Sequence, residues 1–309
     1  MEVSPVPPAA IATMPTLLPE LVQQVRRATP LAGLNQSAWP ALSLLRADHT
    51  AMHLPTVYEP SLCIVVQGSK RAVLGDENYQ YDAGHFLVVS LTLPVIAHIT
   101  EATPDRPYLC IRLGIDTAEV AELLLASRIP AAHTSPSSER GLYLAPMSAP
   151  LADVLLRLLR LLDQPDDLPV LAPLLMRETF FRVLTGPLGE RLRELVDANG
   201  HARRIARAID LIKHRVFEPL HVPELADQLH MSASSLHHRF KQLTAMSPLQ
   251  FQKQLRLHEA RRLMLSEGLA AAQAGHQVGY GSPSQFSRDY RRLFGAPPRR
   301  SLGTAAAMG

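Results

Sequence analysis

Two short groups of polar side chains near the carboxyl end have the types and spacing to hydrogen-bond to the edges of base pairs. The first group is Ser234, His237 and His238, and the second is Ser284, Gln285, Ser287 and Arg288. Residues three or four positions apart lie on one side of an α-helix. In the major groove arginine pairs bidentately with guanine, and glutamine with adenine. The chemistry indicated is therefore recognition of duplex DNA, and Arg288 is the side chain that we expect to discriminate best between bases.

The first group falls within a helix-turn-helix pattern. Residues 223–229 predict a short helix, His230 and Met231 a tight turn, and Ser232 the N-cap of a second helix that runs to residue 243. The apolar residues of that second helix share one face, namely Leu236, Phe240 and Leu243. Burial of this face leaves the first polar group toward solvent or DNA.

The same pattern returns at an interval of 50 residues, where Phe286, Tyr290 and Leu293 repeat the apolar face. Residues 270–278 predict a helix, Gly279 to Gly281 a turn, and Ser282 the N-cap of a helix that begins with Pro283. A longer helix over 249–265 joins the two patterns. We expect it to turn apolar residues inward and cations outward, the former being Leu255, Ala260, Leu263 and Met264 and the latter Lys253, Arg256, Arg261 and Arg262.

The charge of the chain is divided between its two parts. The whole chain carries 31 Lys and Arg against 28 Asp and Glu, a net +3. Residues 201–309 hold 16 of these cations and 7 of these anions, a net +9, which leaves 15 against 21, or −6, before them. A compact basic domain attached to an acidic one is typical of a module that binds a polyanion, with nucleic acid favoured over an anionic membrane surface.

The sequence before residue 197 predicts mainly strands followed by helices. Between residues 43 and 115, short apolar runs alternate with turn residues such as Gly68, Gly75 and Gly84, which indicates an antiparallel sandwich or small barrel. Beyond Asp116 the apolar period becomes helical. The leucine-rich helix over 151–162 has two interpretations, a core helix or the seam of a dimer.

These patterns predict an α+β chain of two domains, as 309 residues allow. The expected boundaries are a flexible arm at 1–14, a strand-rich domain with a helical end at 15–196, a linker at 197–202 and a DNA-binding domain at 203–303. No apolar run approaches the roughly 18 residues of a membrane span, so we expect a cytoplasmic protein without a membrane partner. Cys63 and Cys110 stand in apolar runs, which suits two reduced core thiols.

The second helix-turn-helix pattern resembles the AraC/XylS family of bacterial transcription regulators. The most specific stretches are VGYGSPSQFSR at 278–288 and LFGAPP at 293–298, and Ser247-Pro248 opens the joining helix in the same way. Upstream, LCIVVQGSKR at 62–71 is similar to the cupin-like sensor half of one AraC subgroup.

The resemblance implies a fold, a function and a set of contacts. It implies a cupin-like antiparallel β-barrel that senses a small-molecule effector and dimerises, followed by two helix-turn-helix motifs on double-stranded DNA. It further implies a homodimer that works with RNA polymerase, with activation the commoner role. The recognition helices would enter successive major grooves about 34 Å apart. The two polar groups would contact bases, and Lys241, Arg291 and Arg292 would contact phosphates.

Two other functions stay open. Cupin folds often bind metals through clustered histidines, but His49, His53, His85 and His98 are scattered. We therefore expect no cofactor and no enzymatic activity, with a metal-dependent enzyme fused to a DNA-binding tail as the alternative. The second alternative function is that of a dimer that binds DNA independently of any ligand.

One departure from the family pattern concerns stability. Gly275 stands inside a predicted helix where the family usually has alanine. Glycine in a helix interior costs up to about 1 kcal/mol relative to alanine. The sequence alone therefore predicts that Gly275→Ala raises the thermal stability.

Overall fold

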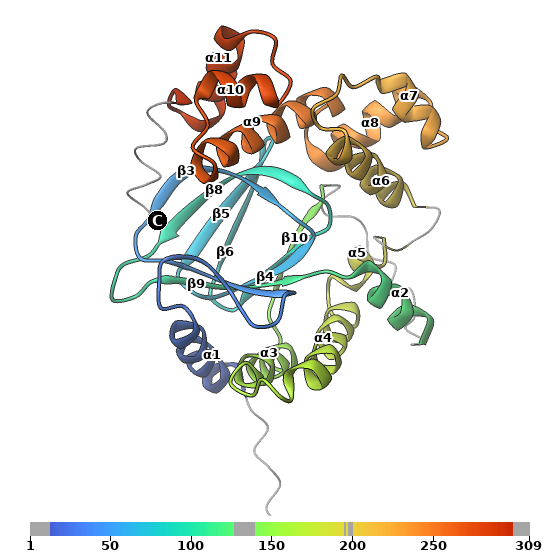
Figure 1. Ribbon diagram of the computed structural model, residues 1–309. Helices are drawn as coiled ribbons and strands as arrows, with labels where there is room; N and C mark the ends of the chain where they lie inside the picture. Colours follow the sequence, from blue (N-terminus) through green and yellow to red (C-terminus); the bar gives the residue numbers. More distant parts are fainter. Residues whose placement is uncertain (1–12, 127–139, 195, 197–199, 299–309) are drawn as a thin grey trace, which may run out of the picture.

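The computed structural model describes residues 13–126, 140–194, 196 and 200–298. Strands and helices make up the first part, and helices alone make up the second (Figure 1). This confirms the predicted α+β architecture. The predicted arm at 1–14 and linker at 197–202 lie largely or partly outside the described residues, as do residues 299–303.

The strands pair antiparallel in two sheets. The six-stranded sheet has the order β1-β2-β9-β4-β7-β10 and the four-stranded sheet the order β3-β8-β5-β6. The strands are β1 (Gly33–Gln36), β2 (Leu42–Ala47), β3 (Ala51–Tyr58), β4 (Ser61–Gln67), β5 (Ser69–Leu74), β6 (Glu77–Asp82), β7 (His85–Val89), β8 (Leu93–Glu101), β9 (Tyr108–Gly114) and β10 (Leu142–Pro146). Residues of both sheets meet in one buried cluster, so the sheets face each other.

Burial along single strands shows which faces are covered. In β5 burial alternates, with Lys70, Ala72 and Leu74 turned inward. In β4 every residue from Ser61 to Val66 is buried. That continuous run follows from its position, because one face of β4 meets the other sheet and the opposite face meets helices.

Helices cover the outer face of the six-stranded sheet, at the bottom of Figure 1. The helices of this part are α1 (Met14–Ala28), α2 (Thr117–Ala126), α3 (Ala149–Leu161), α4 (Leu168–Leu184) and α5 (Gly189–Glu194). The leucine stripe of α3 packs against α1 and α4 and is buried. The core interpretation of 151–162 is therefore confirmed, and the dimer-seam interpretation is wrong because the stripe is covered within one chain.

The sequence patterns do not predict two of the strands. β1 pairs with β2, and β10 pairs with β7 at the edge of the six-stranded sheet. Between the helices predicted at 118–127 and 151–162 the sequence predicts no strand, but Leu142–Pro146 extends along β7 because its buried residues complete the sheet. Cys63 and Cys110 are buried and free, as predicted.

The second part consists of helices that lie above the four-stranded sheet in Figure 1. They are α6 (His201–His214), α7 (Val222–Gln228), α8 (Ala233–Thr244), α9 (Pro248–Ser266), α10 (Ala271–Gln277) and α11 (Pro283–Phe294). Both predicted helix-turn-helix motifs are confirmed, as α7–α8 and α10–α11. No helix in the described ranges has the length and apolar character needed to cross a membrane.

The two motifs differ in how they are anchored. Buried residues of the first motif, such as Leu236 and Phe240, belong to a cluster that continues into the space between the sheets. The second motif has a separate core around Phe286 and Tyr290. The strand-rich domain and the first motif therefore share one core, whereas the second motif packs mainly on α9.

Candidate nucleic-acid interface

The first recognition helix, α8, begins at the predicted cap. The Ser232 hydroxyl accepts a hydrogen bond from the backbone N–H of Ser235 at 3.2 Å. Leu236 and Phe240 are fully buried beneath the helix. All of the residues predicted to face DNA are exposed, namely Ser234, His237, His238 and Lys241. Their spacing places them on one face of α8, so this face is free to meet a ligand.

The second recognition helix, α11, repeats this arrangement. The Ser282 hydroxyl accepts from the Gln285 N–H at 3.4 Å, and Pro283 occupies the first turn. Phe286 and Tyr290 are buried. The predicted DNA-facing residues are again exposed, namely Ser284, Gln285, Ser287 and Arg288. Each motif thus buries its aromatic face and presents its polar face.

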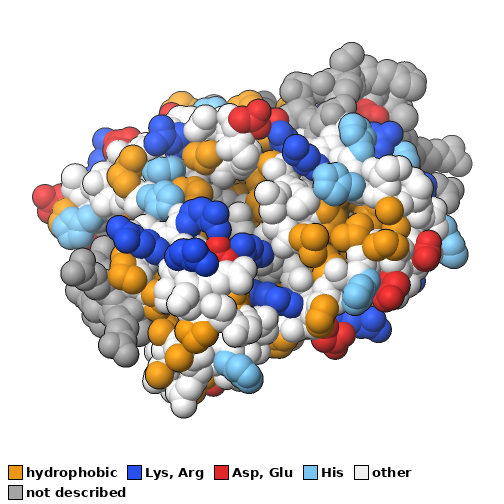
Figure 2. Space-filling view, turned by 90° about the horizontal axis from the view of Figure 1, so that it is seen from above, with side chains coloured by type: hydrophobic (Ala, Val, Ile, Leu, Met, Phe, Trp, Pro, Cys, Tyr) orange, Lys and Arg blue, Asp and Glu red, His pale blue; other side chains and the backbone are white. Residues whose placement is uncertain are grey.

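The predicted phosphate contacts differ in their surroundings. Lys241, Arg291 and Arg292 are all exposed. Arg292 forms an ion pair with Asp289, a buried carboxylate that also pairs with Lys253 at 2.7 Å. Figure 2, viewed from above the helices, shows Lys and Arg side chains gathered on this face. The face is basic, and one of its cations, Arg292, is paired with Asp289.

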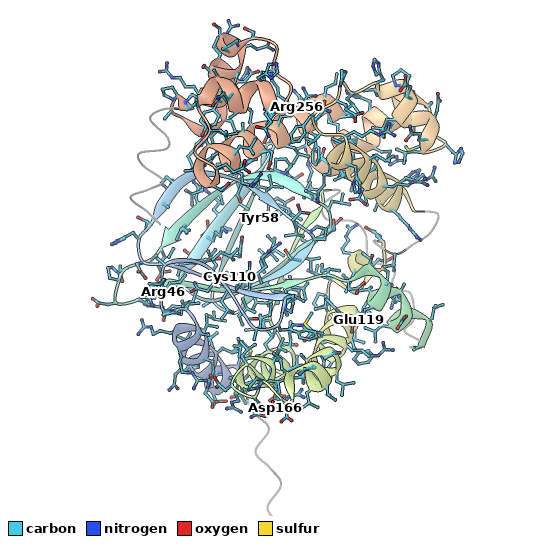
Figure 3. All side chains as sticks on the ribbon, viewed as in Figure 1. Arg46, Tyr58, Cys110, Glu119, Asp166 and Arg256 are labelled. Atoms are coloured by element: carbon cyan, nitrogen blue, oxygen red, sulfur yellow. The ribbon has the colours of Figure 1, made fainter. Side chains whose placement is uncertain are left out.

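Arg256 has a role that the sequence patterns missed. It was predicted to point outward from α9, but its guanidinium donates to the backbone carbonyls of Val216 and Glu218, both at 2.7 Å. It also reaches the carbonyl of Gly279 at 3.5 Å, in the turn of the second motif. Burial lowers its pKa. Arg256, labelled in Figure 3, therefore ties the loop before α7 to the turn before α11.

The structure contradicts the stabilisation expected for Gly275→Ala. A Cβ atom at Gly275 would lie 2.9, 3.0 and 3.3 Å from three ring carbons of Phe286. Phe286 is buried in the core of the second motif and cannot move aside freely. The glycine is therefore required for the close approach of α10 and α11, and alanine is expected to destabilise this motif.

Two ionisable groups beneath α11 are uncharged at neutral pH. Burial, with Arg261 nearby, lowers the pKa of His258 to about 4, and its ring lies 5.3 Å from that of Phe294. Burial, together with the charge of Asp289, raises the pKa of Tyr280. The ionic character of the second motif therefore comes from its Arg and Lys residues and from Asp289.

The strand-rich domain contacts the carboxyl end of α8. Arg140 donates to the carbonyl oxygens of Lys241 at 2.8 Å and Gln242 at 3.1 Å. Its guanidinium also pairs with Asp76 at 3.1 Å and Glu77 at 3.0 Å, at the β5–β6 turn. A cation at the carboxyl end of a helix satisfies carbonyls that lack intrahelical partners. Arg140 thus caps the first recognition helix from the other domain.

Neighbouring backbone groups reinforce this cap. The N–H of Gly141 donates to the carbonyl of Leu243 at 3.0 Å. Gly75, with φ +64°, approaches so closely that a Cβ there would lie 2.6 Å from the Cβ of Ala245. A glycine is therefore needed on the sheet side of this contact.

The other helices are also held by the sheet domain. His53 Nε2 lies 3.0 Å from the carbonyl oxygen of Leu293, at the end of α11. Lys213 of α6 pairs with Glu59 at 2.9 Å. Between β5 and β8 on one side and α9 and α11 on the other lies an open groove of about 530 Å³. The domain interface therefore reaches both recognition helices at their carboxyl ends.

The histidines considered for a metal site do not form one within the described ranges. His53 and His98 are brought together, with the His53 N–H 3.2 Å from His98 Nδ1, while His85 pairs with Asp82 at 2.6 Å. His49 is exposed. Among the residues that the structure describes, no group of three or more His, Cys, Asp or Glu could hold a metal ion.

Family models match both parts of the chain. The model described as "AraC-type transcriptional regulator N-terminus" matches residues 38–191, and that described as "Helix-turn-helix domain" matches residues 225–302. The HTH-type transcriptional regulator ArgR of Pseudomonas aeruginosa is 32% identical over 96 residues, which are 31% of this chain and 29% of ArgR. The HTH-type transcriptional activator RhaS of Pectobacterium atrosepticum is 29% identical over 104 residues, 33% of this chain and 37% of RhaS. The matched stretch thus spans about a third of these curated relatives.

Solved structures resemble the whole architecture. An apo variant of ToxT from Vibrio cholerae superposes with a TM-score of 0.58 over 85% of this chain and 97% of its own, at 13% identity. Wild-type ToxT with an unsaturated fatty acid bound superposes with a TM-score of 0.56 over 85% of this chain and 93% of its own, at 14% identity. This likeness concerns the fold. The two family models, which match both parts of the chain, show that it belongs to the AraC family of transcriptional regulators.

Proposed function

We propose that this protein is a sequence-specific regulator that binds double-stranded DNA through α8 and α11. The observation that carries the proposal is the repeated geometry of the two motifs, each with a serine N-cap, a buried aromatic face and an exposed polar face. Helices of this kind place their first turns against base edges in the major groove. Selection from random duplex DNA tests it, with enrichment of two short boxes as the expected result.

The proposal divides the exposed side chains by role. Gln285 and Arg288 read adenine and guanine, Ser284 and Ser287 assist them, and the first motif uses Ser234, His237 and His238. Three cations contact phosphates and so fix the position of the domain on the duplex without distinguishing bases, namely Lys241, Arg291 and Arg292.

Lys241→Gln is expected to lower the salt dependence of binding. A phosphate contact releases condensed counterions, so its loss reduces the slope of log affinity against log salt by about one unit. Fluorescence anisotropy at several salt concentrations measures the slope. Arg160→Gln is the matched control, because Arg160 lies on α3 and pairs with Glu20. An equal slope change in both variants would mean that net charge, and not a contact at Lys241, is responsible.

The strand-rich domain has a regulatory role in this proposal. It holds the carboxyl ends of α8 and α11, so a small-molecule effector that moves the sheet would change the orientation of both recognition helices. ToxT, whose fold is similar, has been solved with an unsaturated fatty acid bound, which supports an effector here. We further propose a homodimer, contact with RNA polymerase, activation as the outcome, a cytoplasmic location and no enzymatic activity.

Arg140→Met is expected to loosen the end of α8. Arg140 donates two hydrogen bonds to carbonyls of α8, each worth roughly 1 kcal/mol, so amide exchange over the last turn of α8 should accelerate by about 30-fold. Hydrogen exchange of the full chain, read by mass spectrometry, measures this. Arg106→Met removes an exposed cation of the same domain and should change nothing in α8. Unchanged exchange in Arg140→Met would show that the cap does not hold the helix.

A further inference from the structure

The two helix-turn-helix motifs pack on the same helix, α9, but among the described residues they belong to separate hydrophobic clusters. Near the amino end of α9, Phe251 packs edge-to-face on Phe240 of α8, with ring centroids 5.3 Å apart. Later turns of α9 bury Leu257 and Leu263 in the core of the second motif. Apolar packing is non-directional, so directional contacts are needed where the motifs meet to hold them in one relative orientation.

Arg256 lies on α9 between these two packing regions, where the motifs meet (Figure 3). Its guanidinium donates to the carbonyl oxygens of Val216 and Glu218, both at 2.7 Å, in the loop between α6 and α7. A longer contact, at 3.5 Å, reaches the carbonyl of Gly279 in the turn between α10 and α11. Hydrogen bonds are directional and the donors of a guanidinium are fixed in one plane. This side chain therefore sets the loop of one motif and the turn of the other in a defined relation.

The loop and the turn also touch each other directly. A Cβ atom at Gly279, whose φ is +84°, would lie 2.8 Å from the carbonyl oxygen of Phe217 and 3.4 Å from the guanidinium carbon of Arg256. One turn earlier on α9, the buried Gln252 side chain donates to the carbonyl of Glu218 at 2.8 Å. An open cleft of about 220 Å³ lies beside the junction, between α9 and the turn. Polar contacts, and not a shared core, thus join the motifs at this point.

From this junction we infer that Arg256 is a positioning residue for DNA recognition. It fixes the separation and relative orientation of α8 and α11, and so the number of base pairs that the protein accepts between its two DNA boxes. The inference rests on the function proposed above. One base pair moves a binding site about 3.4 Å along the duplex and about 34° around it. Rigidly joined motifs seat both helices at one spacing, whereas loosely joined motifs adapt to neighbouring spacings.

The first test is the affinity of the full chain for duplexes whose boxes stand at the preferred spacing, or one base pair closer or further apart. In Arg256→Met the preference for the best spacing should fall at least roughly fivefold, the effect of one typical hydrogen bond. Base preferences within each box should stay unchanged. Arg262→Met is the matched control, because Arg262 is an exposed arginine of α9 that bonds to Glu259, Ser266 and Glu267 of its own segment. It should keep the spacing preference of the parent.

Two results of this test would overturn the inference. One is an unchanged spacing preference in Arg256→Met. The other is an equal loss of affinity at all spacings together with a lower melting temperature, which would mean that Arg256 only supports stability. Arg256→Lys keeps the charge but not the planar fork of donors. It should also lose spacing preference, and it carries the test if Arg256→Met fails to fold.

A distance measurement without DNA separates this inference from the proposed function. Spin labels at Ser234→Cys on α8 and Ser284→Cys on α11 occupy exposed positions, and the two native thiols are buried. Double electron–electron resonance of the full chain should give one narrow distance distribution for the parent and for Arg262→Met, and a broader or shifted one for Arg256→Met. An identical distribution in Arg256→Met would overturn the inference. Failure of the parent to bind any two-box duplex would contradict the proposed function, whereas the distances would still decide whether Arg256 holds the two helices in place.

Discussion

Arg288→Ala is expected to abolish base preference at one position of the binding site and to weaken binding to the preferred sequence by roughly 5- to 150-fold. The side chain is exposed on the first turns of α11, above a helix face fixed by buried Phe286 and Tyr290. A bidentate pair between arginine and guanine is worth about 1–3 kcal/mol of discrimination. Alanine removes both hydrogen bonds and leaves the helix intact, so the loss should be confined to the base that Arg288 reads.

The measurement is the affinity of the full chain for the preferred duplex and for duplexes changed at each single position. Arg291→Ala is the matched control, since Arg291 is an exposed arginine three residues further along α11. It should weaken all duplexes alike and reduce the salt slope by about one unit. If Arg288→Ala keeps the full set of base preferences, Arg288 does not read a base.

Gly275→Ala is expected to destabilise the second motif, by about 1–2 kcal/mol after the gain in helix propensity is subtracted. The added Cβ would press on three ring carbons of Phe286, at 2.9 to 3.3 Å. Phe286 packs against Tyr280 and Tyr290 with ring centroids 5.3 and 5.6 Å apart, so its displacement would disturb the core that supports α11. Binding of DNA should weaken together with stability.

Thermal unfolding of the full chain measures the effect, as a lower melting temperature for the transition of the second motif. Gly281→Ala provides a control in the same motif, because nothing lies within 4 Å of a Cβ there. That variant should unfold at or slightly above the temperature of the parent. A melting temperature raised by Gly275→Ala would mean that α10 and α11 separate at little cost.

Local patterns were sufficient to predict the DNA-binding motifs. The caps at Ser232 and Ser282 and the apolar spacing of Phe240 and Tyr290 depend on residues within one turn of each other. The exposed faces of both recognition helices follow from the same spacing. Such features are encoded over short distances and can be read without the rest of the chain.

Features that depend on distant partners could not be predicted. In the sequence Arg256 is not distinguished from the other cations of α9. Only the folded structure places the carbonyl oxygens of Glu218 and Gly279 beside its guanidinium. Arg140 caps α8 from about a hundred residues away, and no local pattern signals this. The stabilisation expected for Gly275→Ala was wrong because helix propensity takes account only of α10, whereas the added Cβ would meet Phe286 of α11. Lys70 stands in an ordinary alternating strand, and only the facing sheet makes its burial evident.

The most direct test of the account is selection from random duplex DNA with the full-length protein, at a stated salt concentration and with Arg288→Ala in parallel. We expect the parent to enrich two short boxes about one helical turn apart. Arg288→Ala should lose a single base from one box and keep the other. Failure of the parent to enrich any sequence above the starting pool would contradict the claim that α8 and α11 read DNA.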